Sequence, residues 1–545
     1  MSVGERHLRH GPASGGATSM VTGGGRPDQA ATATGAGTQA DTDTRDGLPA
    51  TTGRARAVIR PTTSPPPAEV IAGDRRRWWI AITMIAAVAI AVRLGFLFGW
   101  LYPMKIAGDA FYYHHAANLF VDGKGWPNPY AFIDRNEYLP DAQHPPLTSL
   151  LLAIPSLFGL RSFVDHQIFS CLLGALSVVA VGLAGRRIAG PVTGPVTGLI
   201  AAAIAAVYPG MWLSDPVLMS ETPAILSCTL LILASYRLWD RRRPLDAVCV
   251  GAALAAAMLA RTELALLALV LATPVVLRLP GLPWTHRLRL LGACAATSVL
   301  LIAPWVGYNL SRFEEPEFIS SGLGVTLAVT HCDDTYYGKQ LGWWSLGCAA
   351  SLPDQPVEAS QRDKFFREAA FRYIGENTGR LPTVAAARLG RTWAVYRPWQ
   401  QAQFDTLEER PQTVSKIGSV SLWCLGAAGV GGVAVLRRRR VPALPLLATP
   451  IVLSVASMLI YGTTRFRAAA EPSVVLLAAI GLGALLSAVL ARRERATWTH
   501  VFWHGAVGST AGVGLHRRSR GVARSARGPN DVRARGRSGA TAQKP

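Results

Sequence analysis

The chain has little charge for its length and none of the short motifs of soluble nucleotide-binding enzymes or zinc proteases. Only 16% of its 545 residues are Asp, Glu, Lys or Arg, whereas 50% are hydrophobic. This balance is typical of a polytopic membrane protein and excludes an ordinary soluble domain. The sequence contains no Walker motif, no Rossmann fingerprint and no HExxH. A cytoplasmic catalytic domain that binds a nucleotide sugar is therefore unsupported.

The seven cysteines show no spacing of the kind that metal ligands have. Cys332 and Cys348 fall in a long polar segment, and a disulfide between them is compatible with an extracytoplasmic position. The other five lie in apolar runs and are expected to be small core residues: Cys171, Cys228, Cys249, Cys294 and Cys424.

The two ends of the chain differ from its apolar middle. Residues 1–77, rich in Gly, Ala, Thr, Pro and Arg over most of their length, are expected to form a disordered cytoplasmic tail. No apolar signal segment opens the chain, so the first span is expected to be an uncleaved anchor. Residues 492–545 carry twelve Lys or Arg against Glu494 and Asp531, a balance of +10. We expect a basic, mostly disordered cytoplasmic tail near anionic lipids and no nucleic-acid partner, because this tail has no folded motif.

Ten apolar runs are long enough to cross the hydrocarbon layer as helices. An eleventh, residues 147–160, is short and is interrupted by Pro155, which favours a half-span or re-entrant helix. We therefore expect an all-α polytopic membrane protein. Its main domain, residues 78–491, would be a bundle of about ten to eleven transmembrane helices with juxtamembrane helices in its loops. The ten runs are 78–100, 166–186, 192–209, 217–238, 245–261, 264–279, 288–308, 415–436, 442–461 and 468–491.

The arginine clusters predict the orientation of these spans. Arg75–Arg77 precede the first span and, if residues 147–160 do not cross, every later arginine cluster lies on the same side. Cytoplasmic loops carry an excess of Lys and Arg, so both termini are expected in the cytoplasm and the protein in the plasma membrane. The first loop, residues 101–146, and the large loop, residues 309–414, are then extracytoplasmic. This topology brings several ionisable groups to one membrane face.

Two acidic residues stand where apolar helices are expected to begin on that face. Asp109 follows the first span, and a carboxylate there can accept a proton from an attacking hydroxyl group or position it. Glu221 follows Ser220 at the start of another span and is a candidate for a second acidic group of the same site. Both residues also fit a purely structural role, because carboxylates stabilise helix N-termini.

His144 stands directly before two prolines that begin the short apolar run. Proline fits the start of a helix, because its fixed φ is helical and its missing N–H is not needed there. His144 would then lie at the positive end of that helix, where a phosphate can dock. A turn with an incidental histidine fits these residues equally well.

The segment after Asp109 is rich in aromatic rings. Tyr112 and Tyr113 are candidates for contact with a substrate. His114 and His115 could join Asp109 as ligands of a divalent metal. Adjacent histidines rarely point to one centre, so we expect no metal and no other cofactor.

Two further charged pairs lie close to span ends on the same face. Arg261 and Glu263 separate two apolar runs with almost no loop, and charges so near the membrane need partners or an aqueous cavity. Arg465 and Arg467 oppose the prevailing charge bias, and arginine forks suit phosphate or pyrophosphate. The alternatives are a mutual pair for the first two and a pair with Glu471 for the others.

These residues, in this order, resemble the membrane glycosyltransferases of the GT-C superfold. The most similar branch is the dolichyl-phosphate-mannose–protein mannosyltransferase and aminoarabinose-transferase-like group, glycosyltransferase families 39 and 83. The resemblance covers roughly residues 78–490, and it depends on the order of the motifs and on the topology. The matching pieces are Arg93, Gly108-Asp109 with Tyr112-Tyr113, His144-Pro145-Pro146, Gly185-Arg186-Arg187, Ser220-Glu221, Leu259-Ala260-Arg261-Thr262-Glu263, Pro304-Trp305 with Asn309, and Arg465-Phe466-Arg467 with Glu471-Pro472.

The resemblance implies transfer of a hexose or pentose from a polyprenyl-phosphate donor, with inversion, at the extracytoplasmic face. Asp109 would activate the acceptor hydroxyl group, and Glu221 would be a second acidic residue near the same cavity. Positive groups would stabilise the leaving lipid phosphate. The candidates for binding that phosphate are His144, Arg261, Arg465 and Arg467, and those for binding the substrate are Tyr112, Tyr113 and Glu263.

One departure and one alternative remain. Many relatives carry a second acidic residue directly after the first, and here that position is Ala110, which weakens a two-carboxylate or metal-based mechanism. The acceptor stays open between a cell-envelope glycan, a lipid and an exported protein.

The alternative function is a multi-span transporter or flippase for a polyprenyl-linked or amphipathic substrate. A transporter should show internal repeats and polar groups near mid-span, whereas the ionisable residues here gather at span ends.

Overall fold

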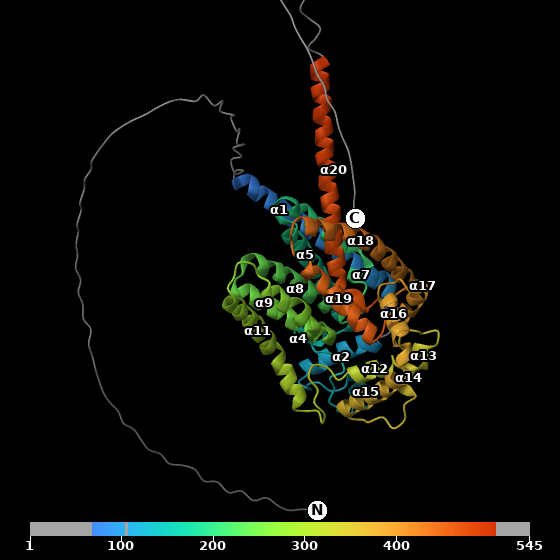
Figure 1. Cartoon of the computed structure of the whole chain (residues 1–545). Helices are drawn as coiled ribbons and strands as arrows, with labels where there is room; N and C mark the ends of the chain where they lie inside the picture. Colours follow the sequence, from blue (N-terminus) through green and yellow to red (C-terminus); the bar gives the residue numbers. More distant parts are fainter. Residues whose placement is uncertain (1–67, 104–106, 508–545) are drawn as a thin grey trace, which may run out of the picture. The chain divides into compact units, whose positions relative to one another are not determined.

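The computed structural model describes residues 68–103 and 107–507, and this part of the chain is a bundle of helices (Figure 1). Within these ranges there is no β-strand, only an isolated bridge between Pro127 and Pro140. The prediction of an all-α polytopic membrane protein is confirmed. Helix α1 begins at Ala68 and α20 runs to Val507, so helices include the inner ends of both predicted tails. The remainder of those tails lies outside the described residues.

Seven helical segments of the described chain are long and apolar enough to cross a membrane. Four shorter apolar segments of 10–17 residues accompany them. Seven of the ten predicted spans coincide with long segments, whereas the other three, 245–261, 264–279 and 442–461, coincide like the predicted half-span with shorter ones. The long segments contain α1 (Ala68–Phe96) with η1 (Leu97–Leu101), α5 (Phe163–Ile188), α6 (Gly190–Val207), α8 (Glu221–Arg241), α11 (Trp284–Leu310), α18 (Gln412–Arg438), and η6 (Phe466–Ala470) with α20 (Glu471–Val507). The shorter ones are α4 (Leu147–Leu157), α9 (Pro244–Ala260), η2 (Thr262–Leu266) with η3 (Ala268–Ala272) and α10 (Thr273–Leu277), and α19 (Leu444–Leu459).

Local sequence signals explain where several helices begin. The Ser162 hydroxyl accepts a hydrogen bond from the Asp165 backbone N–H at 3.1 Å, and the Asp165 carboxylate accepts one from the Ser162 N–H at 2.9 Å. This capping box satisfies two donors that a helix start would otherwise leave unpaired. Pro146 is the N-cap of α4, as the paired prolines of the sequence predict. The start of α4 places His144 three residues before the helix.

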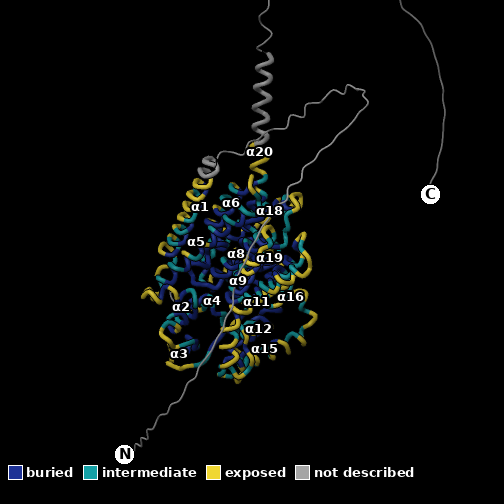
Figure 2. Tube along the Cα trace, turned by 90° about the vertical axis from the view of Figure 1, so that its left-hand side faces the viewer, coloured by how far each residue is buried: buried dark blue, intermediate teal, exposed yellow. Residues whose placement is uncertain are grey.

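Small residues let the central helices approach closely. A Cβ atom added to Gly198 of α6 would lie 2.5 Å from the carbonyl oxygen of Gly182 on α5, and one added to Gly432 of α18 would lie 2.0 Å from that of Leu477 on α20. Such contacts are typical of membrane helices, which associate through close packing rather than through expulsion of water. Buried residues accordingly concentrate where α5, α6, α8 and α19 pack, whereas α1 exposes much of its length (Figure 2).

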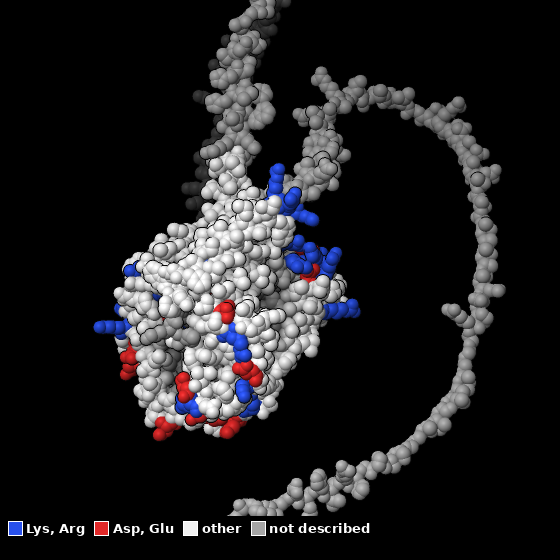
Figure 3. Space-filling model, turned by 180° about the vertical axis from the view of Figure 1, so that it is seen from behind, with Lys and Arg blue, Asp and Glu red and all other residues white. Residues whose placement is uncertain are grey.

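The helices of residues 108–121 and 323–376 lie at the lower end of the bundle in Figure 1, below α4, whereas those of residues 209–212 and 381–404 lie higher. Cys332 and Cys348 of the large loop form a disulfide. A broad area without charged side chains separates basic residues near the upper edge of Figure 3 from most of the acidic residues toward the lower end. The loop helices are α2 (Gly108–Val121), α3 (Pro129–Arg135), α7 (Pro209–Trp212), α12 (Leu323–Ala328), α13 (Asp333–Tyr336), α14 (Leu346–Ala350), α15 (Ala359–Glu376), η4 (Thr378–Arg380), α16 (Leu381–Thr392), α17 (Pro398–Phe404) and η5 (Asp405–Glu408).

Candidate functional site

Arg465 joins segments that lie far apart in the sequence. It directly precedes η6, and its side chain is largely buried, with 14% exposed. The Nη2 atom donates a hydrogen bond to Asp109, in the first turn of α2. The Nε atom donates to Oε1 of Glu221, the first residue of α8, at 2.5 Å. One guanidinium group thus bridges the two acidic residues that the sequence singles out.

A second arginine extends this group of charges. Arg261 ends α9, and its Nη1 donates to Oε1 of Glu221 at 2.5 Å while its Nε donates to Oε1 of Glu263 at 2.6 Å. The guanidinium carbon of Arg261 also lies 5.0 Å from the centroid of the Phe466 ring. We call the following six residues the Arg465 cluster: Asp109, His144, Glu221, Arg261, Glu263 and Arg465.

His144 completes the cluster from the short segment before α4. Its Nε2 lies 3.6 Å from Oδ1 of Asp109, and its Nδ1 lies 3.2 Å from the hydroxyl oxygen of Tyr113. Burial lowers the pKa of His144, although the charge of Asp109 partly opposes this, so the ring is neutral at neutral pH. Tyr112 packs edge-on against the same ring and donates its hydroxyl hydrogen to Asp141 at 2.7 Å. The two tyrosines therefore hold the histidine in place.

Several buried polar atoms at or beside the cluster have no hydrogen-bond partner among the described residues. They include Nε2 of His144, Oε2 of Glu221, Oε2 of Glu408 and Oε2 of Glu409. Buried polar atoms are nearly always paired, because an unpaired one costs about 1–3 kcal/mol. Unpaired atoms gathered around two arginines indicate a place that a polar ligand fills.

Opposing effects set the charge state of Asp109. Burial by itself would raise the pKa of this carboxyl group, but the positive charge of Arg465 and the hydrogen bond from its guanidinium group lower it well below its ordinary value. Asp109 therefore stays ionised across the physiological pH range. A carboxylate with so low a pKa is a good hydrogen-bond acceptor and a weak base.

Asp109 and Glu221 both lie in the first turn of a helix, as the structural alternative expects, but neither is an N-cap residue. The N-cap residue of α2 is Ala107, and that of α8 is Ser220, and neither cap makes a side-chain hydrogen bond. The carboxylates of Asp109 and Glu221 pair with Arg465 instead. Charge pairing across elements, rather than local capping, fixes both groups.

Several predicted site residues lie apart from the cluster. Arg467 donates to Oε1 of Glu471 at 2.7 Å and to the Thr392 carbonyl oxygen at 3.0 Å, so it forms the pair that was its alternative interpretation. The Nδ1 atom of His114 lies 3.0 Å from Nδ1 of His166. Neither His114 nor its neighbour His115 forms a hydrogen bond or an ion pair with Asp109. His114 is thus paired with His166 rather than with Asp109.

Sequence reasoning missed the turn that precedes α18. Glu408 in η5 is buried, and Arg465 is the strongest of the neighbouring charges that act on it. The signal was available, because two adjacent glutamates and an arginine, Glu408 to Arg410, stand just before an apolar span. Sequence reasoning likewise assigned Asp215 no partner, although its carboxylate accepts a hydrogen bond from buried Arg93 at 2.6 Å.

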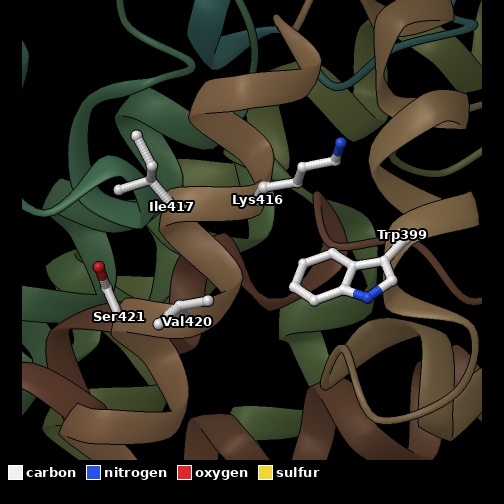
Figure 4. A pocket seen from close by; sticks show the side chains of 5 residues that line it. All are labelled: Trp399, Lys416, Ile417, Val420 and Ser421. Carbon is white, nitrogen blue, oxygen red and sulfur yellow. The ribbon is translucent and has the colours of Figure 1, made fainter.

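A separate groove of about 580 Å³ lies between α17 and α18 (Figure 4). Trp399 lines one side, and Lys416 extends from α18 above its indole ring. The other lining residues are Ile417, Val420 and Ser421. None of these five lining residues forms a hydrogen bond or an ion pair with the Arg465 cluster, so the groove is separate from the place where the candidate site residues converge.

Comparison with protein families gives one match. Residues 143–308 match the family model described as dolichyl-phosphate-mannose-protein mannosyltransferase. The matched segment contains four members of the Arg465 cluster, namely His144, Glu221, Arg261 and Glu263. The chain resembles the GT-C membrane glycosyltransferases. The matched segment runs from just before α4 into α11.

Solved structures with a related arrangement include two membrane glycosyltransferases. The archaeal oligosaccharyltransferase AglB from Archaeoglobus fulgidus, in complex with an inhibitory peptide and a dolichol-phosphate, aligns with a TM-score of 0.48 and 15% identity over 77% of the chain. The chain spans about half of that protein, 51% of its length. ArnT from Cupriavidus metallidurans, bound to undecaprenyl phosphate, aligns with a TM-score of 0.35 and 16% identity, covering 75% of the chain and 78% of ArnT. No curated protein sequence matches the chain.

Proposed function

We propose that this protein transfers a sugar from a polyprenyl-phosphate donor to an acceptor hydroxyl group, with inversion, at the extracytoplasmic face of the plasma membrane. The observation that carries the proposal is the Arg465 cluster, in which arginines and carboxylates from four helix ends converge around unpaired polar atoms. The family match supports the donor class, because its description names a dolichyl-phosphate-linked sugar. The alternative, a flippase, is less well supported, because the charges lie at helix ends rather than at mid-span.

The two arginines of the cluster are suited to the donor phosphate. Arg465 uses Nε and Nη2, and Arg261 uses Nε and Nη1, so each keeps one terminal nitrogen without a partner among the described residues. Two such nitrogens can donate hydrogen bonds to a phosphate and stabilise the charge that develops as it leaves. Nε2 of His144 is a third donor in the tautomer in which Nδ1 accepts the hydroxyl hydrogen of Tyr113.

Asp109 is suited to the acceptor. Its Oδ2 is held by Arg465, whereas its Oδ1 lies near His144 and is the oxygen that can accept a hydrogen bond from an acceptor hydroxyl group. Because Asp109 stays ionised, it activates that hydroxyl group by orienting it and by polarising its O–H bond. The acceptor itself is a cell-envelope glycan, a lipid or an exported protein in this proposal.

The carboxylates of the cluster do not fit a site for a divalent cation. Asp109 and Glu221 already share the cation Arg465, and a metal ion would have to displace the guanidinium group from both. In the described chain, the one group of three candidate ligands consists of Asp334 with Cys332 and Cys348, and these two cysteines form a disulfide. We therefore propose that transfer does not depend on a metal ion, and we expect EDTA to leave the rate unchanged.

A transfer assay with the purified protein in lipid nanodiscs tests the proposal. The protein is offered radiolabelled polyprenyl-phosphate mannose, arabinose and glucose, with envelope extract as the acceptor. Asp109→Asn should reduce transfer by at least about 100-fold, because the oriented carboxylate is lost. Asp122→Asn, which changes an exposed aspartate at the end of the same helix, is the matched control and should retain full activity.

Two results would contradict the proposal. Full activity of Asp109→Asn would remove the assigned role of this residue. Failure of the wild type to transfer label from any donor, with lipid-linked sugar crossing the bilayer of proteoliposomes instead, would favour the flippase.

A further inference from the structure

The turn before α18 is anchored directly beside the Arg465 cluster. Asp405 begins η5, and its carboxylate accepts hydrogen bonds from Gln401 at 2.9 Å and from the Thr464 hydroxyl group at 2.9 Å. Arg410, after the turn, donates to the same Thr464 hydroxyl oxygen at 3.1 Å. Because Thr464 precedes Arg465 in the chain, these bonds hold Glu408 next to the cluster.

Glu408 is buried without the partners that buried carboxyl groups normally have. Only 7% of the residue is exposed, its Oε2 is buried without a hydrogen bond, and it forms no ion pair among the described residues. Its neighbour Asp405, by contrast, has both carboxylate oxygens hydrogen bonded. A structural role would require such bonds, so the free carboxyl group of Glu408 is available to a ligand.

The charges around Glu408 leave it able to exchange a proton. Burial raises the pKa of Glu408 to about 7, with Arg465 and Arg410 opposing the shift and Asp405 and Glu221 adding to it. Glu409, which is half-buried, also has a pKa raised to about 7, by burial and by Asp109. Tyr461 is a further titratable group close enough to Glu408 for the charge of Glu408 to act on it.

We propose that Glu408, rather than Asp109, accepts the proton of the attacking hydroxyl group. This inference rests on the proposed glycosyl transfer. The acceptor oxygen forms a bond to the anomeric carbon of the sugar, while the bond from that carbon to the phosphate oxygen breaks and its electron pair leaves with the lipid phosphate. The hydroxyl proton passes to the carboxylate of Glu408, which later releases it to water. Asp109, held ionised by Arg465, orients the hydroxyl group during this step.

The pH dependence of transfer distinguishes the two roles. In the same assay between pH 5 and 9, the wild-type rate should rise with pH around 7, because only ionised Glu408 accepts a proton. Glu408→Gln should lower the rate by about 100-fold or more and abolish this rise, and Glu408→Asp should restore part of both. Asp109→Asn should lower the rate and keep the rise in its residual activity. Glu409→Gln, the adjacent control with a similarly raised pKa, should keep both the rise and most of the rate.

The outcomes separate this inference from the proposed function. An unchanged pH dependence in Glu408→Gln, or its loss in Glu409→Gln, overturns the role of Glu408 while transfer itself stands. An inactive wild type overturns both. Size-exclusion profiles and melting temperatures of all variants show whether a loss of rate comes from misfolding, and Glu408→Asp then decides whether the carboxyl group itself is needed.

Discussion

At the scale of single residues, two acidic groups of the site have opposite protonation behaviour. Asp109 shares Arg465 with Glu221 and stays ionised, whereas Glu408 lacks a hydrogen-bonded partner and titrates near neutral pH. Environments that separate the pKa values of neighbouring carboxyl groups commonly divide catalytic roles between them. Here burial raises the pKa of Glu408, whereas Arg465 bonds Asp109 directly and holds the pKa of Asp109 low.

The raised pKa of Glu408 predicts a pH-dependent stability. The carboxyl group titrates at about 7 in the folded chain and near 4.5 in the unfolded chain. Between these values only the unfolded chain ionises, so wild-type stability falls as pH rises from 4.5 to 7 and then levels off. Glu408→Gln lacks this loss and should be the more stable protein at pH 8, by about 3 kcal/mol at most. Melting temperatures of both proteins at pH 5 and pH 8 check this. A difference between Glu408→Gln and the wild type that is the same at both pH values would contradict the prediction.

At the scale of elements, a buried ion pair ties α1 to the segment before α8. The Arg93 guanidinium donates to Oδ2 of Asp215 at 2.6 Å, and Asp215 also accepts a hydrogen bond from Thr222 at 2.6 Å. Gly174 of α5 faces this pair, and a Cβ atom there would lie 1.9 Å from Oδ2 of Asp215. The Asp215 carboxylate fills the space beside Gly174 that a larger side chain would occupy. Helix α1, helix α5 and the segment before α8 therefore meet at this ion pair.

Gly174→Ala should therefore destabilise the bundle. The added methyl group displaces the Asp215 carboxylate from Arg93, and breaking a buried ion pair costs about 3–5 kcal/mol. Gly292→Ala in α11 is the matched control, because a Cβ atom there meets nothing within 4 Å. The control should be neutral or more stable, since alanine favours a helix over glycine by about 1 kcal/mol. Thermal unfolding in detergent compares the two variants, and equal melting temperatures would refute the tight packing at Gly174.

At the scale of the whole molecule, the arginine clusters and the disulfide support the same orientation. The clusters lie at span ends opposite the large loop, and cytoplasmic loops carry such an excess. A disulfide between Cys332 and Cys348 persists in an oxidising compartment, which supports an extracytoplasmic large loop. The proposed side of catalysis follows from both.

Cysteine labelling in intact cells tests this orientation. Glu376→Cys, at an exposed position in α15 of the large loop, should react with a membrane-impermeant maleimide. Arg243→Cys, exposed before α9, should react only after the cells are lysed. The wild type measures the background from its own thiols, including the exposed Cys424. Labelling of Arg243→Cys but not Glu376→Cys in intact cells would invert the topology and place the site in the cytoplasm.

The apolar helices, their approximate ends and the candidate residues near those ends could be predicted from the sequence. These features depend on local properties: the length of an apolar run, a proline pair before α4, and charges at span ends. The positions of Asp109, Glu221, Arg261 and Arg465 beside such ends could therefore be predicted, and so could their convergence.

The partner of each charged side chain could not be predicted from the sequence, because it depends on how distant segments pack. Arg465 and Arg467 are two residues apart, and residues at this spacing in a helical turn do not face the same way, so one joins Asp109 and the other pairs with Glu471. The burial of Glu408 depends on hydrogen bonds between Asp405 and Thr464, which are 59 positions apart. Sequence patterns describe faces and ends of helices, whereas pairing and desolvation depend on contacts between distant segments, and those contacts set the chemistry of this site.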